Sequence, residues 1–298
     1  METILNLLIL VIGLLIGSFL NVCIYRMPLS RLDRWYSPDE GEEAQSILAK
    51  LRKDLSITKP ARSFCPSCQH QLRWFENIPV VSWLLLGGKC SSCKTSISIR
   101  YPVVELLTGN LALLSVMKFG FSATALVVFG TLCVFIIITF IDYDYYVIPD
   151  ELSIRGSIIA IMIALISQFY GIFSPPVVAI NPEFPIPPIL DSVLGMLAGA
   201  GFLLLIYFAY LFLRKREGLG LGDIKLLLFI GALFGIQAAL YTIFIGSLLG
   251  SILGLGLILI GGRKLSSAIP FGPYLTVSAT LYIFTGFALP NAILNIFA

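Results

Sequence analysis

Long apolar stretches alternate with short polar connections along almost the whole chain. The longer stretches approach or exceed the roughly 20 residues that a helix needs to cross the hydrocarbon core of a bilayer. Residues 224–260 are too many for one such helix, so we divide this stretch near Gly235-Ile236-Gln237. The pattern predicts an all-α polytopic membrane protein with about eight transmembrane helices, near residues 4–25, 102–117, 121–141, 154–173, 189–213, 224–236, 238–260 and 268–289.

The composition excludes an ordinary soluble domain. The 298 residues are 57% hydrophobic and 12% charged, and the mean hydropathy is +0.93, far above the soluble average. The first stretch lacks the basic start and the small-residue cleavage site of a secretory signal, so we expect it to remain as a helix. We divide the chain into a first transmembrane helix at 1–25, a loop domain at 26–100 and a helical membrane domain at 101–298.

The basic residues predict the orientation. Of the 20 Lys and Arg residues, 12 lie in the loop 26–100. With eight helices, the connections on the opposite side contain one basic residue, Lys118. The positive-inside rule therefore predicts that the loop domain faces the cytoplasm and that both termini lie outside. The later basic groups fall on the same side as the loop, namely Arg155, 214–216, Lys225 and 263–264.

Two Cys-x-x-Cys pairs lie in the loop domain. Cys65 and Cys68 form the first pair, and Cys90 and Cys93 follow after 21 residues. Four thiolates at this spacing are typical of a tetrahedral Zn²⁺ site, and a reducing cytoplasm disfavours disulfides. Redox-active dithiols and unligated cysteines are the alternatives. His70, the only histidine, is either a substitute ligand or an exposed polar residue beside the site.

Two aspartates lie at the ends of apolar stretches. Asp142 ends one stretch, and Asp223 follows the glycine-rich segment 218–222 and opens another. An ionisable residue at the membrane is costly to bury and is therefore a functional candidate. The single histidine excludes a His-Glu-x-x-His metalloprotease, so hydrolysis beside the bilayer would rest on these two carboxylates. The alternative is that both aspartates cap helices or turns.

Other features have less specific interpretations. Glu105 lies just inside the second apolar stretch and either faces the helix bundle or reaches the surface. Glycines four residues apart at 13–17, 195–199 and 246–254 predict close packing between membrane helices.

Several motifs together resemble the type IV prepilin peptidase family, membrane aspartyl proteases that process pilin-like precursors. The similar segments are Gly17-Ser18-Phe19-Leu20-Asn21 with 25–28, the paired cysteines with 77–105, and 140–150 and 220–225. The resemblance implies that Asp142 and Asp223 are the catalytic pair. Asp144 and Asp150 match motif positions that are not catalytic. The segments 29–63 and 174–188 depart from the commoner family pattern.

The resemblance also implies the reaction and its setting. The expected enzyme is an endopeptidase of the bacterial cytoplasmic (inner) membrane that cleaves the leader from type IV prepilins or pseudopilins. Many such enzymes also methylate the new N-terminus with S-adenosylmethionine, and we expect this second activity too. The expected partners are the protein substrate and the lipid bilayer, with structural Zn²⁺ and no nucleic acid.

Three alternative functions remain. The first is a peptidase without methyltransferase activity. The second is a transporter that uses the carboxylates as an ion relay, although no repeat symmetry between the two halves of the chain supports it. The third is a non-catalytic assembly factor that docks through the cysteine-rich loop.

Overall fold

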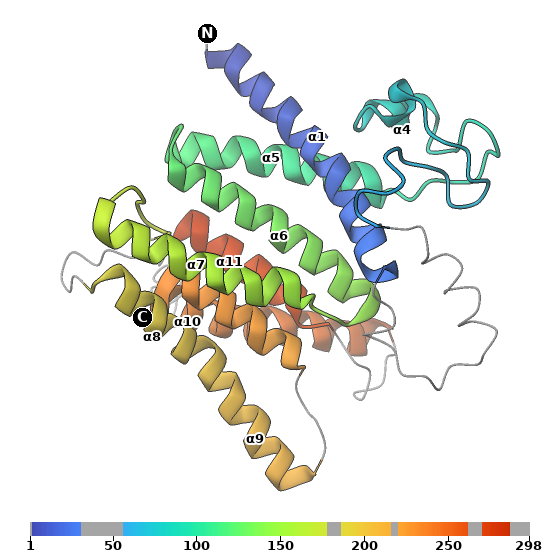
Figure 1. Ribbon diagram of the computed structural model, residues 1–298. Helices are drawn as coiled ribbons and strands as arrows, with labels where there is room; N and C mark the ends of the chain where they lie inside the picture. The colour runs from blue at the N-terminus through green and yellow to red at the C-terminus, as the bar shows by residue number, and fades with distance from the viewer. Residues whose placement is uncertain (1, 31–55, 178–185, 216–219, 262–269, 287–298) are drawn as a thin grey trace. The chain divides into compact units, whose positions relative to one another are not determined.

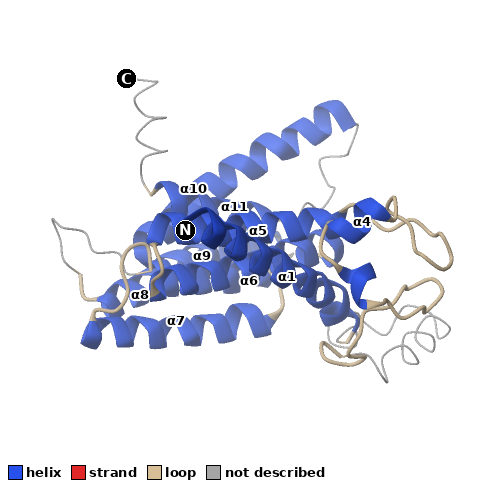
Figure 2. Cartoon of the chain, turned by 90° about the horizontal axis from the view of Figure 1, so that it is seen from above, coloured by secondary structure: helices blue, strands red, loops and turns tan. Residues whose placement is uncertain are grey.

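The computed structural model describes residues 2–30, 56–177, 186–215, 220–261 and 270–286. These residues form helices joined by loops (Figures 1 and 2), with two isolated β-bridges and no strand within the described ranges. The chain divides into two compact units, Met1–Gly120 and Phe121–Ala298.

Some of the sequence-based predictions concern residues outside the described ranges. These residues are most of the acidic segment 29–63, part of the segment 174–188, the start of the glycine-rich motif at 218–219, and the basic pair 263–264.

Unit 1 is built on two closely packed helices, α1 (Glu2–Leu29) and α5 (Arg100–Phe119). A Cβ placed on Gly13 would lie 2.7 Å from the Cα of Gly109, and a Cβ on Gly17 would lie 2.7 Å from the Cα of Glu105. The glycine stripe therefore lets the two backbones touch, as predicted. Residues 56–99 connect these helices through the short helices η1 (Trp74–Asn77) and α4 (Val81–Leu85).

Unit 2 is arranged around helix α10, whose buried apolar side chains form the centre of its core. Leu226, Leu227 and Ile230 of this helix are completely buried. α10 packs against α7, α8 and α11, and α11 also packs against α6. The helices of the unit are α6 (Ala123–Tyr145), α7 (Asp150–Tyr170), α8 (Pro188–Met196), the π-helical turn η2 (Leu197–Gly201), α9 (Phe202–Arg214), α10 (Leu221–Gly261) and α11 (Gly272–Thr285).

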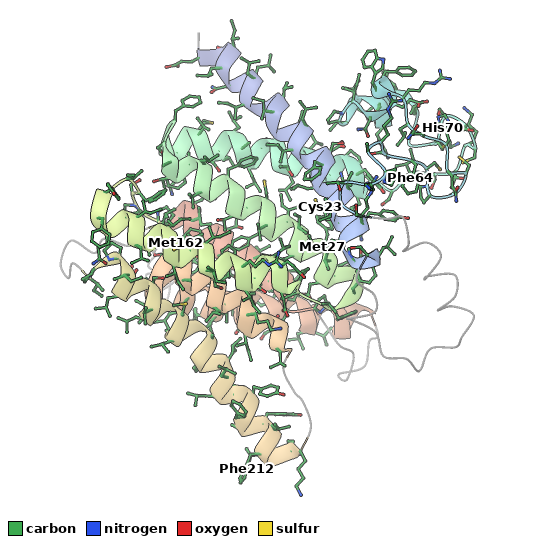
Figure 3. The ribbon with its side chains drawn as sticks, in the orientation of Figure 1. Cys23, Met27, Phe64, His70, Met162 and Phe212 are labelled. Carbon is green, nitrogen blue, oxygen red and sulfur yellow. The ribbon has the colours of Figure 1, made fainter. Side chains whose placement is uncertain are left out.

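The outer faces of these helices carry exposed apolar side chains. Met162 on α7 is 53% exposed and Phe212 on α9 is 86% exposed (Figure 3). Large apolar side chains on the outside of a helical bundle indicate contact with lipid rather than water.

Helix α10 turns back on itself at Gly235. This residue has the non-helical angles φ 80° and ψ −174°, which glycine adopts without steric cost. Gly222 and Gly272 both lie against Ile148, and Gly250 lies against Phe271 at the start of α11. A straight helix would separate Gly222 from Gly250 by about 42 Å. The second half of α10 therefore runs back alongside the first, toward the end of the unit where α10 begins.

Six helices in the described ranges are long and apolar enough to span a membrane. Eight were predicted. The numbers differ because α10 counts once despite its turn, and because α11 is described over 14 residues. The predicted division near Gly235 is where the helix breaks, so the two halves of α10 and the helix α11 account for the remaining predicted segments.

Candidate active site and metal centre

Four cysteines of unit 1 converge on one point. The Sγ atoms of Cys65, Cys68, Cys90 and Cys93 lie within 4.8 Å of one another. The Cys65–Cys93 separation is 3.8 Å and the Cys68–Cys90 separation is 4.0 Å. Four sulfurs bound tetrahedrally at about 2.3 Å from a zinc ion would lie about 3.8 Å apart. The donor set therefore fits an ion of that size and geometry.

The backbone repeats the same turn at both cysteine pairs. Gln69 and Lys94, each the residue after the second cysteine, adopt left-handed conformations with φ of 57° and 61°. The Gln69 N–H donates to the Cys65 carbonyl at 2.8 Å, and the Lys94 N–H donates to the Cys90 carbonyl at 3.1 Å. Two matching turns that aim their sulfurs at one point favour a shared metal over separate redox dithiols.

His70 lies outside the group of four converging sulfurs. Its Nε2 is 3.4 Å from Oε2 of Glu76. The Ser91 hydroxyl and the Arg73 N–H also bond Glu76 and hold the pKa of its carboxyl below the usual range. His70 is therefore a neighbour of the cysteine site and Glu76 is an ionised side chain beside it. Among the described residues, the side chains grouped for metal binding are the four cysteines.

Asp142 and Asp223 come together in unit 2. Asp142 lies in the last turn of α6, which ends where Tyr146 adopts a left-handed conformation and donates its N–H to the Asp142 carbonyl. Asp223 lies in the first turn of α10. The two residues are 5% and 8% exposed. Gly222, next to Asp223, and Gly272, whose N–H bonds Asp142, both lie against Ile148. Two buried carboxyl groups thus meet where three helices of the unit end or begin.

The third of these helices, α11, contributes a backbone donor. The N–H of Gly272, the first residue of α11, donates to Oδ2 of Asp142 at 2.9 Å. A Cβ on Gly272 would lie 2.7 Å from the same oxygen, so this position leaves no room for a side chain. Sequence reasoning missed Gly272, although Pro270-Phe271-Gly272-Pro273 interrupts the last apolar stretch and signals a helix start there.

Ile148 fills the space between the beginnings of α10 and α11. A Cβ on Gly222 would lie 3.1 Å from the Ile148 Cβ, and a Cβ on Gly272 would lie 3.2 Å from its Cδ1. Ile148 is 5% exposed. The glycine before Asp223 therefore serves close packing, which brings the first turn of α10 toward Asp142.

The other acidic motif residues lie apart from this pair. Asp144 is exposed. Asp150, the first residue of α7, is bonded through Oδ1 to Nζ of Lys225 at 2.6 Å, in a partly exposed ion pair. Lys225 therefore links α10 to α7 through Asp150.

Glu105 faces the interior of unit 1. It is 7% exposed, and its Oε2 accepts the N–H of Val80 at 2.7 Å. This result decides between the two predicted placements of Glu105: it is a buried polar group and not a surface residue.

Taken together, the apolar helices, the paired buried carboxyl groups and the four-cysteine cluster define a multi-pass membrane protein with a carboxylate site and a metal-binding domain. Two family profiles match the chain: the bacterial peptidase A24 N-terminal domain over residues 11–119, and the type IV leader peptidase family over residues 127–255. The profiles correspond closely to the two units of the structure.

Whole-chain comparisons agree with the profiles. The chain is 33% identical to the prepilin leader peptidase/N-methyltransferase of Pseudomonas putida, covering 93% of this chain and 89% of that protein. It is 38% identical to the protein of the same name from Neisseria gonorrhoeae, covering 92% and 88%. No solved structure matches significantly. The chain belongs to the type IV leader peptidase family, and it is a peptidase of the bacterial inner membrane.

Proposed function

We propose that this chain is an aspartyl endopeptidase that cleaves the leader from type IV prepilins or pseudopilins at the cytoplasmic face of the membrane, and that it N-methylates the new N-terminus with S-adenosylmethionine. The observation that carries the peptidase is that Asp142 and Asp223 are both buried, at helix ends whose glycines pack on the same residue, Ile148. The names of the relatives support both activities, because they are prepilin leader peptidase/N-methyltransferases.

The surroundings of the two carboxyl groups support different roles. Asp142 accepts the first N–H of α11, and the N-terminus of a helix carries a partial positive charge that favours an anion. Two neighbouring carboxylates cannot both ionise easily, so the proton resides on Asp223. Asp142 is then the general base and Asp223 the general acid.

The cleavage step follows from these roles. Asp142 takes a proton from a water molecule, whose oxygen forms a bond to the scissile carbonyl carbon. Asp223 donates its proton to the carbonyl oxygen, which gives an uncharged tetrahedral diol. The carbon–nitrogen bond then breaks as Asp142 passes its proton to the leaving amine and Asp223 recovers a proton from the diol. No covalent intermediate with the enzyme is formed.

Cys65, Cys68, Cys90 and Cys93 are proposed to hold one structural Zn²⁺. The ion would fix the two cysteine turns against each other, and it supplies folding free energy rather than chemistry to the peptidase.

The test uses the purified full-length protein with a pilin-like precursor and S-adenosylmethionine, and mass spectrometry of the product. Asp142→Asn and Asp223→Asn should each lower cleavage by at least about 100-fold, because each removes one proton-transfer group. Asp144→Asn is the matched control, since Asp144 is exposed in the same helix end, and it should keep substantial activity. The wild-type product should carry a methylated N-terminus.

Two results would contradict the proposal separately. Full cleavage by Asp142→Asn or by Asp223→Asn would contradict the assignment of these two residues as the catalytic pair. Complete cleavage with an unmethylated N-terminus would leave a peptidase without methyltransferase activity.

A further inference from the structure

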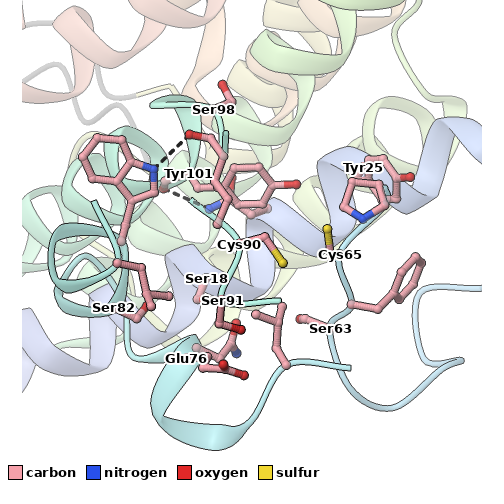
Figure 4. A pocket seen from close by; sticks show the side chains of 18 of the residues that line it. Ser18, Tyr25, Ser63, Cys65, Glu76, Ser82, Cys90, Ser91, Ser98 and Tyr101 are labelled. Carbon is pink, nitrogen blue, oxygen red and sulfur yellow. Dashed lines mark hydrogen bonds between the residues drawn. The ribbon is translucent and has the colours of Figure 1, made fainter. Parts of the chain in front are cut away.

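Unit 1 contains a cavity that the peptidase reaction does not use. Its volume is about 340 Å³, within the range of small-molecule sites. It lies between the end of α1, the start of α5 and the loops that carry the four cysteines, and Glu76, Ser82 and Tyr101 are among its walls (Figure 4). Each of these elements belongs to unit 1.

The charges around the cavity favour a cation. Glu76 and Glu105 are its acidic lining residues, and both are buried. Arg26 also lines the cavity, but its guanidinium donates to a row of backbone carbonyls, of which that of Pro60 is nearest at 2.7 Å. The other acceptors are the carbonyls of Ser56, Ile57 and Arg62. A phosphate-bearing ligand would therefore meet two carboxyl groups and a guanidinium that already donates to four backbone carbonyls.

The remaining walls suit a planar, hydrogen-bonding group. Trp83 and Tyr101 provide aromatic surfaces, and the Trp83 indole is fixed by donating Nε1–H to the Ile97 carbonyl at 3.1 Å. Asn21 and Asn77 add amide groups, which both donate and accept. Aromatic faces stack on nucleobases and also attract cations.

Backbone strain occurs at the edge of the same cavity. Val80 has φ 62° and ψ −49°, and the N–H of Val81 reaches back to the Pro79 carbonyl at 2.6 Å. This is the tight three-residue turn that is rare and strained, above all for a β-branched residue. The buried Glu105 accepts the Val80 N–H. Strain of this kind is often held at ligand sites.

We propose that this cavity, lined by Glu76, Glu105, Trp83 and Asn21, binds the methyl donor S-adenosylmethionine, an adenine nucleoside that carries a sulfonium and an ammonium group. The proposal rests on the proposed methyltransferase function. The aromatic and amide walls receive the adenine, and the carboxylates bind the ribose hydroxyls and the cationic methionine part.

The transfer step needs no further cofactor. The lone pair of the uncharged N-terminal amine forms a bond to the methyl carbon, and the carbon–sulfur electron pair goes to sulfur, which becomes the neutral thioether of S-adenosylhomocysteine. The amine becomes a secondary ammonium and releases a proton to water.

The experiment measures donor binding to the full-length protein by calorimetry. Wild-type protein should bind S-adenosylmethionine and bind ATP at least about tenfold more weakly, because the carboxylates repel phosphate. Glu76→Gln and Glu105→Gln should each weaken donor binding at least about tenfold. The amide of Glu105→Gln can still accept the Val80 N–H, so the turn is retained. Glu2→Gln, an exposed change at the far end of α1, should bind like wild type.

A second measurement does not depend on the folding of variants. Ultraviolet cross-linking of radiolabelled S-adenosylmethionine to wild-type protein, followed by peptide mapping, should place the label within residues 18–26 or 63–105. Label confined to residues 121–298 would overturn the assignment.

The outcomes separate this site from the proposed function. Donor binding that is unchanged in both glutamate variants would overturn the cavity assignment while the methyltransferase activity stands. Prepilin cleavage by a wild-type preparation that binds no donor would overturn the donor site while the peptidase stands. S-adenosylhomocysteine keeps the ammonium group of the donor but lacks its sulfonium charge. A glutamate variant that binds both molecules more weakly than wild type therefore supports contact between that glutamate and the ammonium group. A variant that binds only S-adenosylmethionine more weakly supports contact with the sulfonium.

Discussion

The contact between Asp142 and Gly272 shows how one backbone N–H can define a chemical role. The carboxylate of Asp142 lies at the end of α6 and bonds the first N–H of α11 at 2.9 Å. The partial charges of the peptide groups near a helix start favour the ionised form of such a carboxylate. Because Pro273 has no N–H to offer, the Gly272 N–H is the donor that counts at this helix start.

Gly272→Ala should therefore impair the peptidase. The added Cβ would lie 2.7 Å from Oδ2 of Asp142, closer than carbon and oxygen tolerate, so the carboxylate must move. We expect cleavage to fall about 10- to 100-fold, because a displacement of about 1 Å at a reacting group has that effect. Steady-state cleavage of a pilin-like precursor measures it.

Gly130→Ala is the matched control for this change. Gly130 lies on α6, the helix that carries Asp142, and a Cβ there meets no atom within 4 Å. Its activity should equal that of wild type. Equal activity in Gly272→Ala would show that the carboxylate tolerates a shift and that the Gly272 contact is not part of the site.

At this scale, the sequence predicted residues whose chemistry is local and missed those whose partners are distant. Asp142 and Asp223 could be singled out because each ends or opens an apolar stretch. The role of Gly272 depends on a partner 130 positions away, which no local pattern reveals. Glu105 could be noticed but not placed, because its acceptor role involves a strained turn at Val80.

At the scale of elements, the turn of α10 depends on an aspartate of α8. Asp191 is 4% exposed, and its Oδ1 accepts the N–H of Ile236, the first residue after the break, at 3.2 Å. The second half of α10 starts at this point, and its first N–H groups have no carbonyl partner within the helix. Asp191 thus caps that half from a neighbouring helix, as an N-cap side chain does within one.

Gly235→Ala and Asp191→Ala should both destabilise unit 2. A Cβ on Gly235 would collide with Oδ2 of Asp191 and would sit on a residue with φ 80°. Removing the Asp191 carboxylate would leave the Ile236 N–H without its acceptor. We expect a loss of about 1–3 kcal/mol for each change, seen as a lower midpoint of thermal unfolding in detergent.

A control on the same helix separates this effect from helix propensity. Gly256 lies in the second half of α10, and a Cβ there meets no atom within 4 Å, so Gly256→Ala should not lower the midpoint. An unchanged midpoint in both Gly235→Ala and Asp191→Ala would mean that the turn does not need this contact.

The two cysteine turns are the second structural element for which we predict a measurable property, the binding of zinc. Purified protein should carry about one zinc ion per chain, and Cys65→Ser or Cys90→Ser should lose it, because three sulfurs leave the tetrahedral site incomplete. Hydrogen exchange should then speed up across residues 64–98. Cys133→Ser, which alters a cysteine of α6 outside the cluster, should retain the metal. Wild-type protein prepared without chelators and free of zinc would contradict the prediction.

The elements were predictable where their cause is local. The spacing of the cysteines predicted the four-sulfur cluster. The segment Gly235-Ile236-Gln237 predicted the break in the long apolar stretch. The capping role of Asp191 was missed, because an aspartate near the start of an apolar stretch looks like an ordinary first-turn residue. Its acceptor role appears only when α8 lies beside the break in α10.

For the whole molecule, the turn in α10 decides how the chain can cross a bilayer. If α10 were straight, its two ends at Leu221 and Gly261 would lie on opposite sides of the membrane. Because Gly222 and Gly272 both pack on Ile148, the start of α10 and the start of α11 lie at one end of unit 2. Lys225, in the first turn of α10, therefore lies at the end of unit 2 where α11 begins.

This arrangement predicts which connections face the cytoplasm. Residues 26–100, which connect α1 to α5, contain 12 of the 20 basic residues, whereas the turn between α5 and α6 adjoins Lys118 alone.

Thr58→Cys and Phe121→Cys place a neutral, exposed thiol in these two connections. A membrane-impermeant thiol reagent added to intact cells should label Phe121→Cys and leave Thr58→Cys unlabelled until the membrane is permeabilised. Wild-type protein in intact cells is the control and should stay unlabelled, because the cysteine cluster would be shielded by the membrane. Labelling of Thr58→Cys in intact cells would place the cysteine domain outside the cell. The orientation predicted from the basic residues would then be reversed.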